Sequence, residues 1–258
     1  MIAVKTLRIA VAGLAVLMTA SLAACGSSDE TGAPADGTTG PITVFAAASL
    51  TESFTTLGKQ FESSHPGATV TFNFGGSSAL ATQINQGAPA DVFASAAPKN
   101  MQAVTEAGTP TTFVRNQLVI AVGAGNPKGV TGLADLAKPD LKVALCAEAV
   151  PCGAAARTAV EAAAVKITPV TLEQDVKAAL SKVKLGEVDA ALVYRTDAKA
   201  SAADVDAIEF PESAKAINDY PIAVLTNAKN ATGGRAFVDY VLSADGVKVL
   251  TAAGFQAP

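Results

Sequence analysis

The sequence is poor in the residues that most often carry catalysis. Its 258 residues include no Trp, three Tyr, three Cys and a single histidine, His65. A histidine-based triad would depend on His65, which lies in the turn-like segment SSHPG. No serine stands in a G-x-S-x-G elbow, and the chain has neither a P-loop nor a strand-linked G-x-G-x-x-G motif. Catalysis is therefore poorly supported, and we expect a protein that is not an enzyme and has no cofactor.

The few cysteines do not fit the spacing of metal or redox motifs. Zinc needs four nitrogen or sulfur ligands, whereas the chain beyond its N-terminal segment offers only Cys146, Cys152 and the distant His65. A thioredoxin-like site has two residues between its cysteines, and five separate this pair. A structural disulfide and two free buried thiols remain as explanations.

Positive charge is scarce as well. The chain has 19 Lys and Arg against 23 Asp and Glu, a formal net charge of −4 that becomes −6 if Lys5 and Arg8 are removed with a signal. There is no basic patch and no Trp. These features argue against nucleic acid as a partner.

The N-terminus has the pattern of an export signal. Lys5 and Arg8 precede an apolar run from Ile9 to Met18, which is too short to span a bilayer. The tetrapeptide LAAC, ending at Cys25, resembles the lipobox of bacterial lipoproteins; a plain signal peptidase site is the alternative. We expect a signal peptide over residues 1–24 and lipidation of Cys25. The product would be exported and anchored to the cell membrane, facing outside the cytoplasm.

The rest of the chain divides into a tether and an α/β body. Residues 25–40 are rich in Gly, Ser, Thr, Asp and Pro and predict a flexible tether. Beyond them, short β-rich runs alternate with helical patterns, which predicts mostly parallel sheets flanked by helices. The periodicity predicts a helix over residues 172–185. We expect two lobes, with boundaries at 41–121 plus 222–258 for lobe 1 and 122–221 for lobe 2.

Three strand-to-helix turns carry small or hydroxyl residues. Ser49 follows one predicted strand, Ser77 follows another, and Cys152 lies in the first turn of a helix that begins near Pro151. The first N–H groups of a helix have no partner inside it and carry the positive end of its dipole, so several such turns facing one cleft would bind an anion. Singly, each has a simpler explanation: Ser49 and Glu52 fit a capping box, GGSS fits a loop, and Cys152 fits a structural role.

Taken together, the motifs closely resemble the periplasmic molybdate-binding proteins of ABC importers. The runs AAASL and GAPADVF are the specific ones, and the resemblance extends through QLVIAV, VPCG, EQDVKAAL, DAALVY, YPIAVL and AFVDYVLS over residues 42–255. This family has the type II periplasmic-binding-protein fold, in which two α/β lobes close over the ligand. The resemblance implies a monomeric receptor that captures molybdate or tungstate and delivers it to a membrane permease.

The resemblance also implies a set of ligand contacts. Ser49 and Ser77 would each offer a backbone N–H and a hydroxyl, Cys152 and Val176 a backbone N–H, and Tyr194 its hydroxyl. Family members often carry Ala where Cys152 stands, a change that a backbone contact tolerates. From the residues alone, Val176 also fits a helix core position and Tyr194 a buried strand aromatic. Molybdenum would be bound only as molybdate, at these same residues.

Donors of this kind suit an oxyanion that carries no proton. A tetrahedral dianion presents only acceptors at neutral pH, so neutral donors can replace its hydration shell. Sulfate has the same charge and shape, and selection against it would depend on cavity size. The alternatives are a receptor of the same fold for sulfate or another oxyanion such as phosphate, a ferric-iron receptor, for which three Tyr and one His are few ligands, and a secreted serine hydrolase using Ser49 or Ser77.

Export bears on the two remaining cysteines. Outside the cytoplasm the environment is oxidising, and with Cys25 taken by lipid an even number of thiols is left. We therefore predict a disulfide between Cys146 and Cys152 that stabilises the turn around Cys152. On the chain-entropy model so short a loop contributes roughly 2 kcal/mol.

Overall fold

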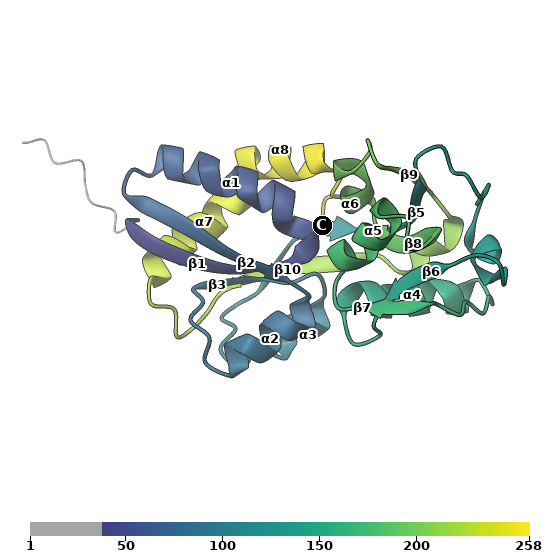
Figure 1. Cartoon of the computed structure of the whole chain (residues 1–258). Coiled ribbons are helices and arrows are strands. Elements are labelled where there is room, and N and C mark those ends of the chain that lie inside the picture. The colour runs from purple at the N-terminus through teal and green to yellow at the C-terminus, as the bar shows by residue number, and fades with distance from the viewer. Residues whose placement is uncertain (1–37) are drawn as a thin grey trace, which may run out of the picture. The chain divides into compact units, whose positions relative to one another are not determined.

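The computed structural model of the chain describes residues 38–258. The predicted signal peptide, the lipidation site Cys25 and most of the predicted tether lie outside these described residues. Within residues 38–258, no helix has both the length and the hydropathy needed to cross a membrane. The described part is a mixed α/β structure built on two five-stranded sheets, as predicted (Figure 1).

In the first sheet, one strand is reversed. In spatial order the strands are β2 (Ala68–Gly75), β1 (Gly40–Ala47), β3 (Val92–Ala94), β10 (Asn218–Val224) and β4 (Thr111–Asn116). Strand β1 pairs in parallel with both of its neighbours, β2 and β3, whereas β10, the strand closest to the C-terminus of the chain, runs antiparallel to both of its partners, β3 and β4. The sheet is therefore mostly parallel, and a single reversed strand comes from the end of the chain.

The second sheet repeats this plan. Its first three strands are parallel, and the fourth runs antiparallel to both neighbours. In each sheet, the reversed strand is the first strand in sequence after the chain crosses from the other sheet. In spatial order the strands are β7 (Thr171–Glu173), β6 (Val143–Cys146), β8 (Ala190–Tyr194), β5 (Leu118–Gly123) and β9 (Val205–Ile208).

Helices cover both faces of the first sheet, because its strands are apolar on both sides. In β1, Ile42 and Val44 pack in one buried cluster with the long helices, while Phe45 packs in another on the opposite face. We call this sheet and its helices lobe 1. One face carries α1 (Thr51–Ser64), α7 (Ala231–Leu242) and α8 (Ala244–Ala253), and the other carries α2 (Ser77–Asn85) and α3 (Pro98–Gln102) (Figure 1).

The second sheet is enclosed in the same way by shorter elements. Its core is rich in Ala and Val, and strand β5, which is buried except at its last residue, is an almost continuous apolar run. We call this sheet and its helices lobe 2. Its helices are α4 (Pro151–Ala162), α5 (Val176–Lys184) and α6 (Arg195–Ala200), with 3-10 turns η2 (Leu133–Ala137) and η3 (Pro211–Lys215); a further turn, η1 (Ala48–Leu50), belongs to lobe 1.

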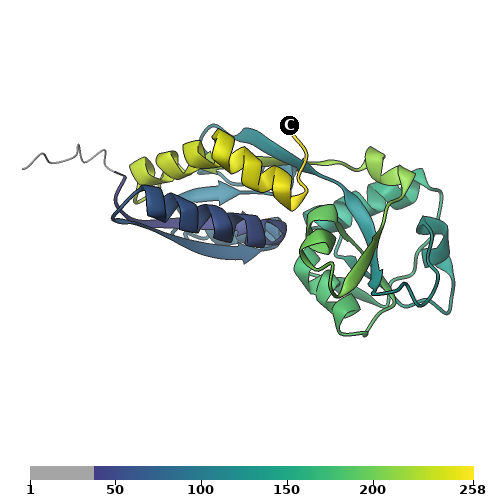
Figure 2. The same cartoon turned by 90° about the horizontal axis from the view of Figure 1, so that it is seen from above.

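Two segments of chain cross between the lobes side by side (Figure 2). Gln117 alone separates β4 from β5, and the return crossing ends where β10 begins, at Asn218. Asn116 and Asn218 face each other in the antiparallel pairing of β4 and β10. The lobe boundaries proposed from the sequence, at 121/122 and 221/222, fall inside β5 and β10, so sheet membership changes a few residues before each of them.

The helix predicted over residues 172–185 is shorter than expected. Residues Thr171–Glu173 instead form β7, which pairs in parallel with β6. Asp175 then has extended backbone angles, and its carboxylate accepts a hydrogen bond from Ala178 N at 3.0 Å, which places the start of α5 at Val176. Apolar spacing could not show the boundary, because strand pairing and a side-chain cap determine it.

Candidate anion-binding site

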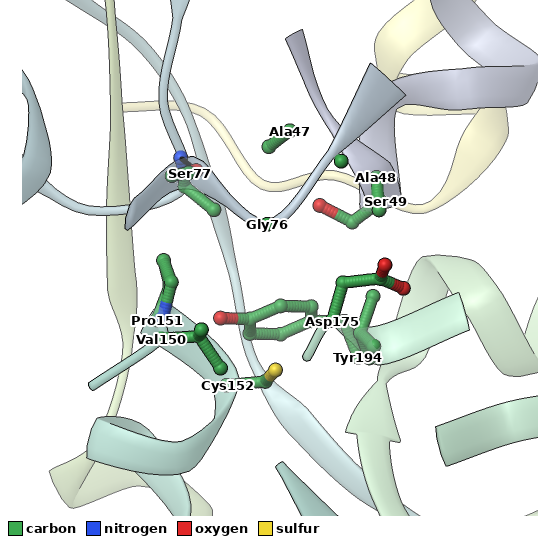
Figure 3. Close-up of a pocket in the computed structure, with 13 residues that line it drawn as sticks. Ala47, Ala48, Ser49, Gly76, Ser77, Val150, Pro151, Cys152, Asp175 and Tyr194 are labelled. Atoms are coloured by element: carbon green, nitrogen blue, oxygen red, sulfur yellow. Dashed lines mark hydrogen bonds between the residues drawn. The ribbon is translucent and has the colours of Figure 1, made fainter. Parts of the chain in front are cut away.

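A small cavity lies where the two lobes meet (Figure 3). Its volume is about 10 Å³. That space is too small for a sugar, a peptide or a nucleotide. The described residues that line it include no Lys, Arg or His; they are Ala47, Ala48, Ser49, Gly75, Gly76, Ser77, Ala96, Val150, Pro151, Cys152, Asp175, Val176 and Tyr194.

Three helices begin at the wall of this cavity. The first residues of α2, α4 and α5 are Ser77, Pro151 and Val176, and all three line it. One helix comes from lobe 1 and two from lobe 2. Their first N–H groups have no partner inside the helix, and the positive ends of their dipoles converge, so the cavity attracts an anion without a cationic side chain.

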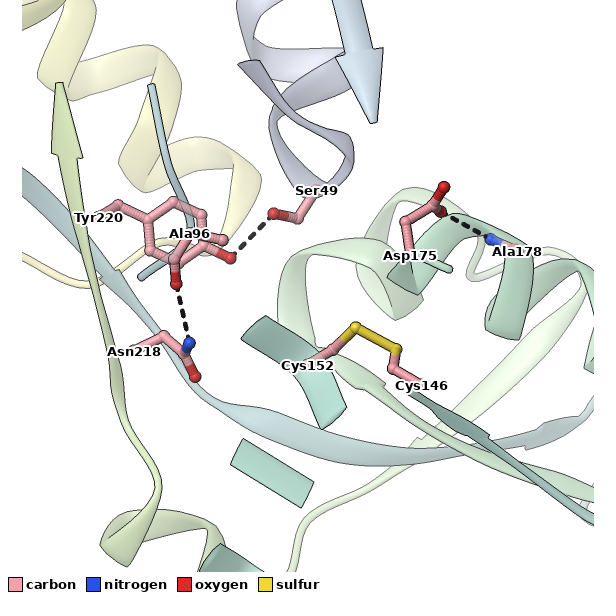
Figure 4. The surroundings of a disulfide bond; sticks show 8 residues. All are labelled: Ser49, Ala96, Cys146, Cys152, Asp175, Ala178, Asn218 and Tyr220. Atoms are coloured by element: carbon pink, nitrogen blue, oxygen red, sulfur yellow. Dashed lines mark hydrogen bonds between the residues drawn. A yellow bond between two sulfur atoms is a disulfide. The ribbon is translucent and has the colours of Figure 1, made fainter. Parts of the chain in front are cut away.

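Ser49 is held by the far end of the chain. It lies in η1, directly after β1, and is buried. Its Oγ is 2.8 Å from the hydroxyl oxygen of Tyr220, a fully buried residue of β10 (Figure 4). The capping box considered for Ser49 and Glu52 is absent among the described residues, since no side chain caps α1. Ser49 therefore contributes to the cavity and does not stabilise the helix end.

Ser77 has a partner within its own lobe. It is the first residue of α2 and almost completely buried. Its Oγ accepts a hydrogen bond of 2.9 Å from the backbone N–H of Ala96, which also lines the cavity. Because this bond occupies an acceptor position of the oxygen, the hydroxyl proton remains available to a ligand.

Tyr194 presents a hydroxyl that the described residues leave unsatisfied. The residue is the last of β8 and is 1% exposed, yet its oxygen has no hydrogen-bond partner there. Figure 3 shows this hydroxyl on the side of the ring that faces Pro151 and Val150. Burial, together with the nearby Tyr220 and Asp197, raises the pKa of Tyr194 well above its ordinary value. The group stays a neutral donor, and an unpaired buried donor favours a ligand that accepts.

The lobes touch directly beside the cavity. Gly76 precedes α2, and a Cβ on it would lie only 2.4 Å from the carbonyl oxygen of Gln174 in lobe 2. Glycine is therefore needed for this approach of the two backbones. The structure thus has the two walls of the cavity in contact, which is the arrangement that encloses a small ligand.

The turn that leads into α4 is tightly built. Cys146, the last residue of β6, is joined to Cys152 by a disulfide, with the two Cα atoms 5.7 Å apart (Figure 4). A Cβ on the next residue, Gly153, would lie 1.9 Å from the carbonyl oxygen of Ala147. The chain therefore folds back on itself at this point, and the N–H groups at the start of α4 are fixed against the end of β6.

Charged groups lie near the cavity but are paired among themselves. Lys177, in the first turn of α5, donates to Glu52 Oε1 of lobe 1 at 2.7 Å, and its Nζ lies 3.2 Å from Asp197 Oδ1. Burial lowers the pKa of Lys177, but the carboxylates of Asp197 and Glu52 outweigh it and the pKa is raised. Burial raises the pKa of Asp197 to about 6, with Lys177 opposing the shift.

Asp175 adds an acidic residue to the wall, and its side chain caps a helix. One carboxylate oxygen accepts from Ala178 N at the start of α5 (Figure 4). The acidic side chain thereby serves the helix end, where a negative charge is favourable.

The only histidine of the chain lies far from Ser49. His65 follows the last residue of α1 and stacks on Phe61, whereas Ser49 precedes the first turn of that helix. The 14 residues between these ends correspond to roughly 20 Å along the axis. A hydrolytic triad of Ser49 and His65 is therefore excluded by distance. In the part of the chain that the structure describes, no group of three or more His, Cys, Asp and Glu side chains could hold a metal ion.

Comparison with known proteins agrees with this geometry. The family described as "Bacterial extracellular solute-binding protein" matches residues 42–256, which is nearly the whole described chain. The chain belongs to this family. The resemblance noted in the sequence motifs is thereby confirmed, and so is the expectation that the protein is of an exported class.

Individual relatives of this solute-binding protein extend the match. The "Molybdate-binding protein ModA" of Mycobacterium tuberculosis is 44% identical over 251 residues, covering 95% of this chain and 96% of the relative. The solved periplasmic molybdate-binding protein of Azotobacter vinelandii is 20% identical, with a TM-score of 0.71 over 84% of this chain and 99% of its own. The sulfate-binding protein SubI of M. tuberculosis has the same TM-score, 0.71, at 19% identity, over 84% of this chain and 86% of its own. At these low identities the two structures show the fold alone.

All five ligand contacts predicted for this solute-binding protein line one cavity. Ser49 and Ser77 come from lobe 1, and Cys152, Val176 and Tyr194 from lobe 2. Sequence reasoning missed the residues that support them: Tyr220 behind Ser49, Ala96 behind Ser77, and the Lys177 group. Tyr220 is 171 positions from Ser49, so no local pattern could have connected them.

Proposed function

We propose that this solute-binding protein captures molybdate, and with it tungstate, and delivers the anion to the membrane permease of an ABC importer. It performs no chemistry on its ligand. The observation that carries the proposal is the cavity itself, where three helix N-termini, two serine hydroxyls and an unpaired buried tyrosine hydroxyl converge. The relatives named for molybdate binding and the motifs shared with them support the same ligand.

The donors match a dianion that carries no proton. Ser49 and Ser77 would give two donors each, and Cys152, Val176 and Tyr194 one each, which makes seven. Hydrogen bonds to a charged group contribute about 1.5–3 kcal/mol each, enough together to replace a hydration shell. A protonated anion would bring a donor of its own, and the only carboxylate among the described residues of this wall is that of Asp175, one oxygen of which already accepts from Ala178 N. The proposal therefore favours molybdate, tungstate and sulfate over phosphate.

Sulfate is the main alternative ligand. It has the charge and shape of molybdate, and this fold also occurs in a sulfate-binding protein. Molybdate and tungstate are nearly equal in size and larger than sulfate, so the width of the closed cavity would decide between them. The identity of 44% to a protein named for molybdate makes molybdate the preferred choice.

We also propose that the protein is anchored by lipid at Cys25 and acts as a monomer. The lipobox-like LAAC segment and the short apolar run before it support the anchor. A Cys25→Ala variant should appear in the medium or periplasm instead of the membrane fraction, and should lose incorporation of labelled palmitate. Membrane retention of that variant would contradict the anchor without affecting the proposed ligand.

The ligand can be tested by isothermal titration of the mature protein with molybdate, tungstate, sulfate and phosphate. We expect molybdate and tungstate to bind with similar affinity, sulfate more weakly and phosphate weakest. Tighter binding of sulfate than of molybdate would make the protein a sulfate receptor. Absence of binding to all four anions would overturn the oxyanion proposal. Turnover of ester substrates that is lost in a Ser49→Ala variant would favour a hydrolase instead.

A further inference from the structure

The two serines of the cavity differ in what holds their oxygen atoms. For Ser77 the partner is a backbone N–H, that of Ala96, which can only donate. The direction of that hydrogen bond is therefore fixed, and the Ser77 proton is free. For Ser49 the partner is another hydroxyl, that of Tyr220, and in a pair of hydroxyls either oxygen can donate. A further neighbour must therefore determine which of the two hydroxyls, that of Ser49 or that of Tyr220, is the donor.

Asn116 supplies that direction. Its Oδ1 accepts a hydrogen bond from the backbone N–H of Gln117 at 3.0 Å, which identifies the other end of the amide as the NH₂ group. This Nδ2 donates to Thr196 Oγ1 at 2.9 Å and lies 3.5 Å from the Tyr220 hydroxyl oxygen. Tyr220 therefore meets a donor on the side of Asn116, and its own proton is left for the acceptor on its other side, Ser49 Oγ.

We propose that Tyr220 is a positioning residue for ligand binding: its hydroxyl donates to Ser49 Oγ and leaves the Ser49 proton to point into the cavity. Asn116, Tyr220 and Ser49 then form a directed chain of hydrogen bonds that ends at the ligand. Such chains polarise their members, so the last donor is strengthened. The inference rests on the proposed function, since it assigns a role in oxyanion binding.

Burial keeps this chain in one arrangement. Tyr220, Asn116 and Ser49 are 0%, 1% and 4% exposed, so water does not compete for the three groups. Burial also raises the pKa of Tyr220 far above its ordinary value, and the phenol keeps the proton that it donates. Asn116 is the last residue of β4 and Tyr220 the third of β10, so both lie in lobe 1 next to the points where the chain crosses between the lobes. Ser49 is thus oriented by strand ends next to the crossings, whereas Ser77 is oriented by Ala96, which follows β3.

A double-mutant cycle tests the inference. The mature protein and its Ser49→Ala, Tyr220→Phe and doubly substituted variants are titrated with molybdate. Tyr220→Phe should weaken binding about three- to tenfold, the effect of one hydrogen bond. In the Ser49→Ala background the same change should alter affinity less than about twofold, because the group that Tyr220 orients is gone. Tyr240→Phe, which removes a hydroxyl hydrogen-bonded to Gln60 on the outer face, is the control and should have no effect.

Two results would overturn the inference. One is unchanged molybdate affinity in Tyr220→Phe; the other is an equal loss with and without Ser49, which would mean that Tyr220 acts through general packing. The same four proteins are also unfolded in urea without ligand. Ser49 and Tyr220 should be non-additive in stability, and additive effects would show that their hydrogen bond does not form. If the unsubstituted protein binds none of the four anions, the proposed function fails, and the role of Tyr220 in binding fails with it. In that case, non-additive effects of the two substitutions on the free energy of unfolding would show only that the hydrogen bond between Ser49 and Tyr220 forms.

Discussion

The two lobes supply different kinds of contact to the same cavity. Lobe 1 contributes the N-terminus of α2 and two serine hydroxyls, each with a partner that occupies its oxygen. Lobe 2 contributes the N-termini of α4 and α5, where the backbone offers the donors, and the single hydroxyl of Tyr194. Substitutions in lobe 1 should therefore act through side-chain chemistry. In lobe 2 they should act by changing the backbone conformation that presents the N–H donors. Replacing a glycine that the tight turn requires can therefore weaken binding more than replacing a side chain that faces the ligand.

The largest expected effect is in lobe 2, at Gly153. A Cβ at this position would lie 1.9 Å from a backbone oxygen, which cannot move without opening the turn. Gly153→Ala should lower the free energy of unfolding by more than about 2 kcal/mol and abolish measurable molybdate binding. Urea unfolding and titration calorimetry measure the two effects. Gly123→Ala is the matched control in the same lobe, since its Cβ would meet nothing within 4 Å. Equal free energies of unfolding for the two variants would show that the turn at residue 153 can accommodate a Cβ.

A second effect in lobe 2 concerns pH. Burial raises the pKa of Asp197 from 3.8 to about 6, so between these values the folded protein holds a proton that the unfolded chain releases. Stability from this group is full below pH 4 and is lost as the pH rises through about 6. The difference corresponds to roughly 3 kcal/mol.

Asp197→Asn isolates that contribution. The free energy of unfolding of the variant, measured in urea between pH 4.5 and 7.5, should fall less with rising pH than that of the unsubstituted protein. Parallel curves for the two proteins would show that Asp197 titrates at its ordinary pKa. Carboxylates that do not contact Lys177 affect both proteins equally and cancel in the comparison.

The lobe 1 contacts provide the third test. Removing a hydroxyl that donates to a dianion costs about 1.5–3 kcal/mol, so Ser49→Ala and Ser77→Ala should each weaken molybdate binding about 10- to 100-fold. Val176→Ala should change affinity only a few-fold, because the donor in lobe 2 is a backbone N–H. Calorimetry compares the three variants directly. A loss in Val176→Ala as large as that in Ser49→Ala would remove the distinction between the lobes.

The smallest effect concerns the disulfide of lobe 2. Replacing both Cys146 and Cys152 by Ala should lower the free energy of unfolding by roughly 2 kcal/mol and weaken molybdate binding only slightly. The backbone at residue 152 remains able to donate, and Ala provides the same N–H. Thermal unfolding and calorimetry give the two values. Thiol titration of the unfolded, unreduced protein should find neither cysteine free; two free thiols per chain would mean that the bond does not form in the exported protein.

Local sequence patterns predicted the strand-to-helix turns of the site, but not the residues that contact these turns in the folded chain. Ser49 and Ser77 could be found because each stands between an apolar strand and a helical repeat, and the physics of helix N-termini is local. The helix predicted from residue 172 was too long, because pairing of β7 with β6 and the cap by Asp175 are decided elsewhere in the chain. Lys177 looks like an ordinary helix-surface lysine in sequence, and only the approach of Glu52 and Asp197 shows its paired state.

By itself, the sequence determined the α/β class, the absence of a catalytic histidine arrangement and the small polar turns from which an anion site could be built. These depend on composition and on periods of two and 3.6 residues, which neighbouring positions carry. Only the tertiary structure decided that five distant turns and strand ends meet in one small cavity, and that Tyr220 lies behind Ser49. The reason is that convergence and hydrogen-bond direction depend on groups up to 171 positions apart, which only the packed lobes bring together.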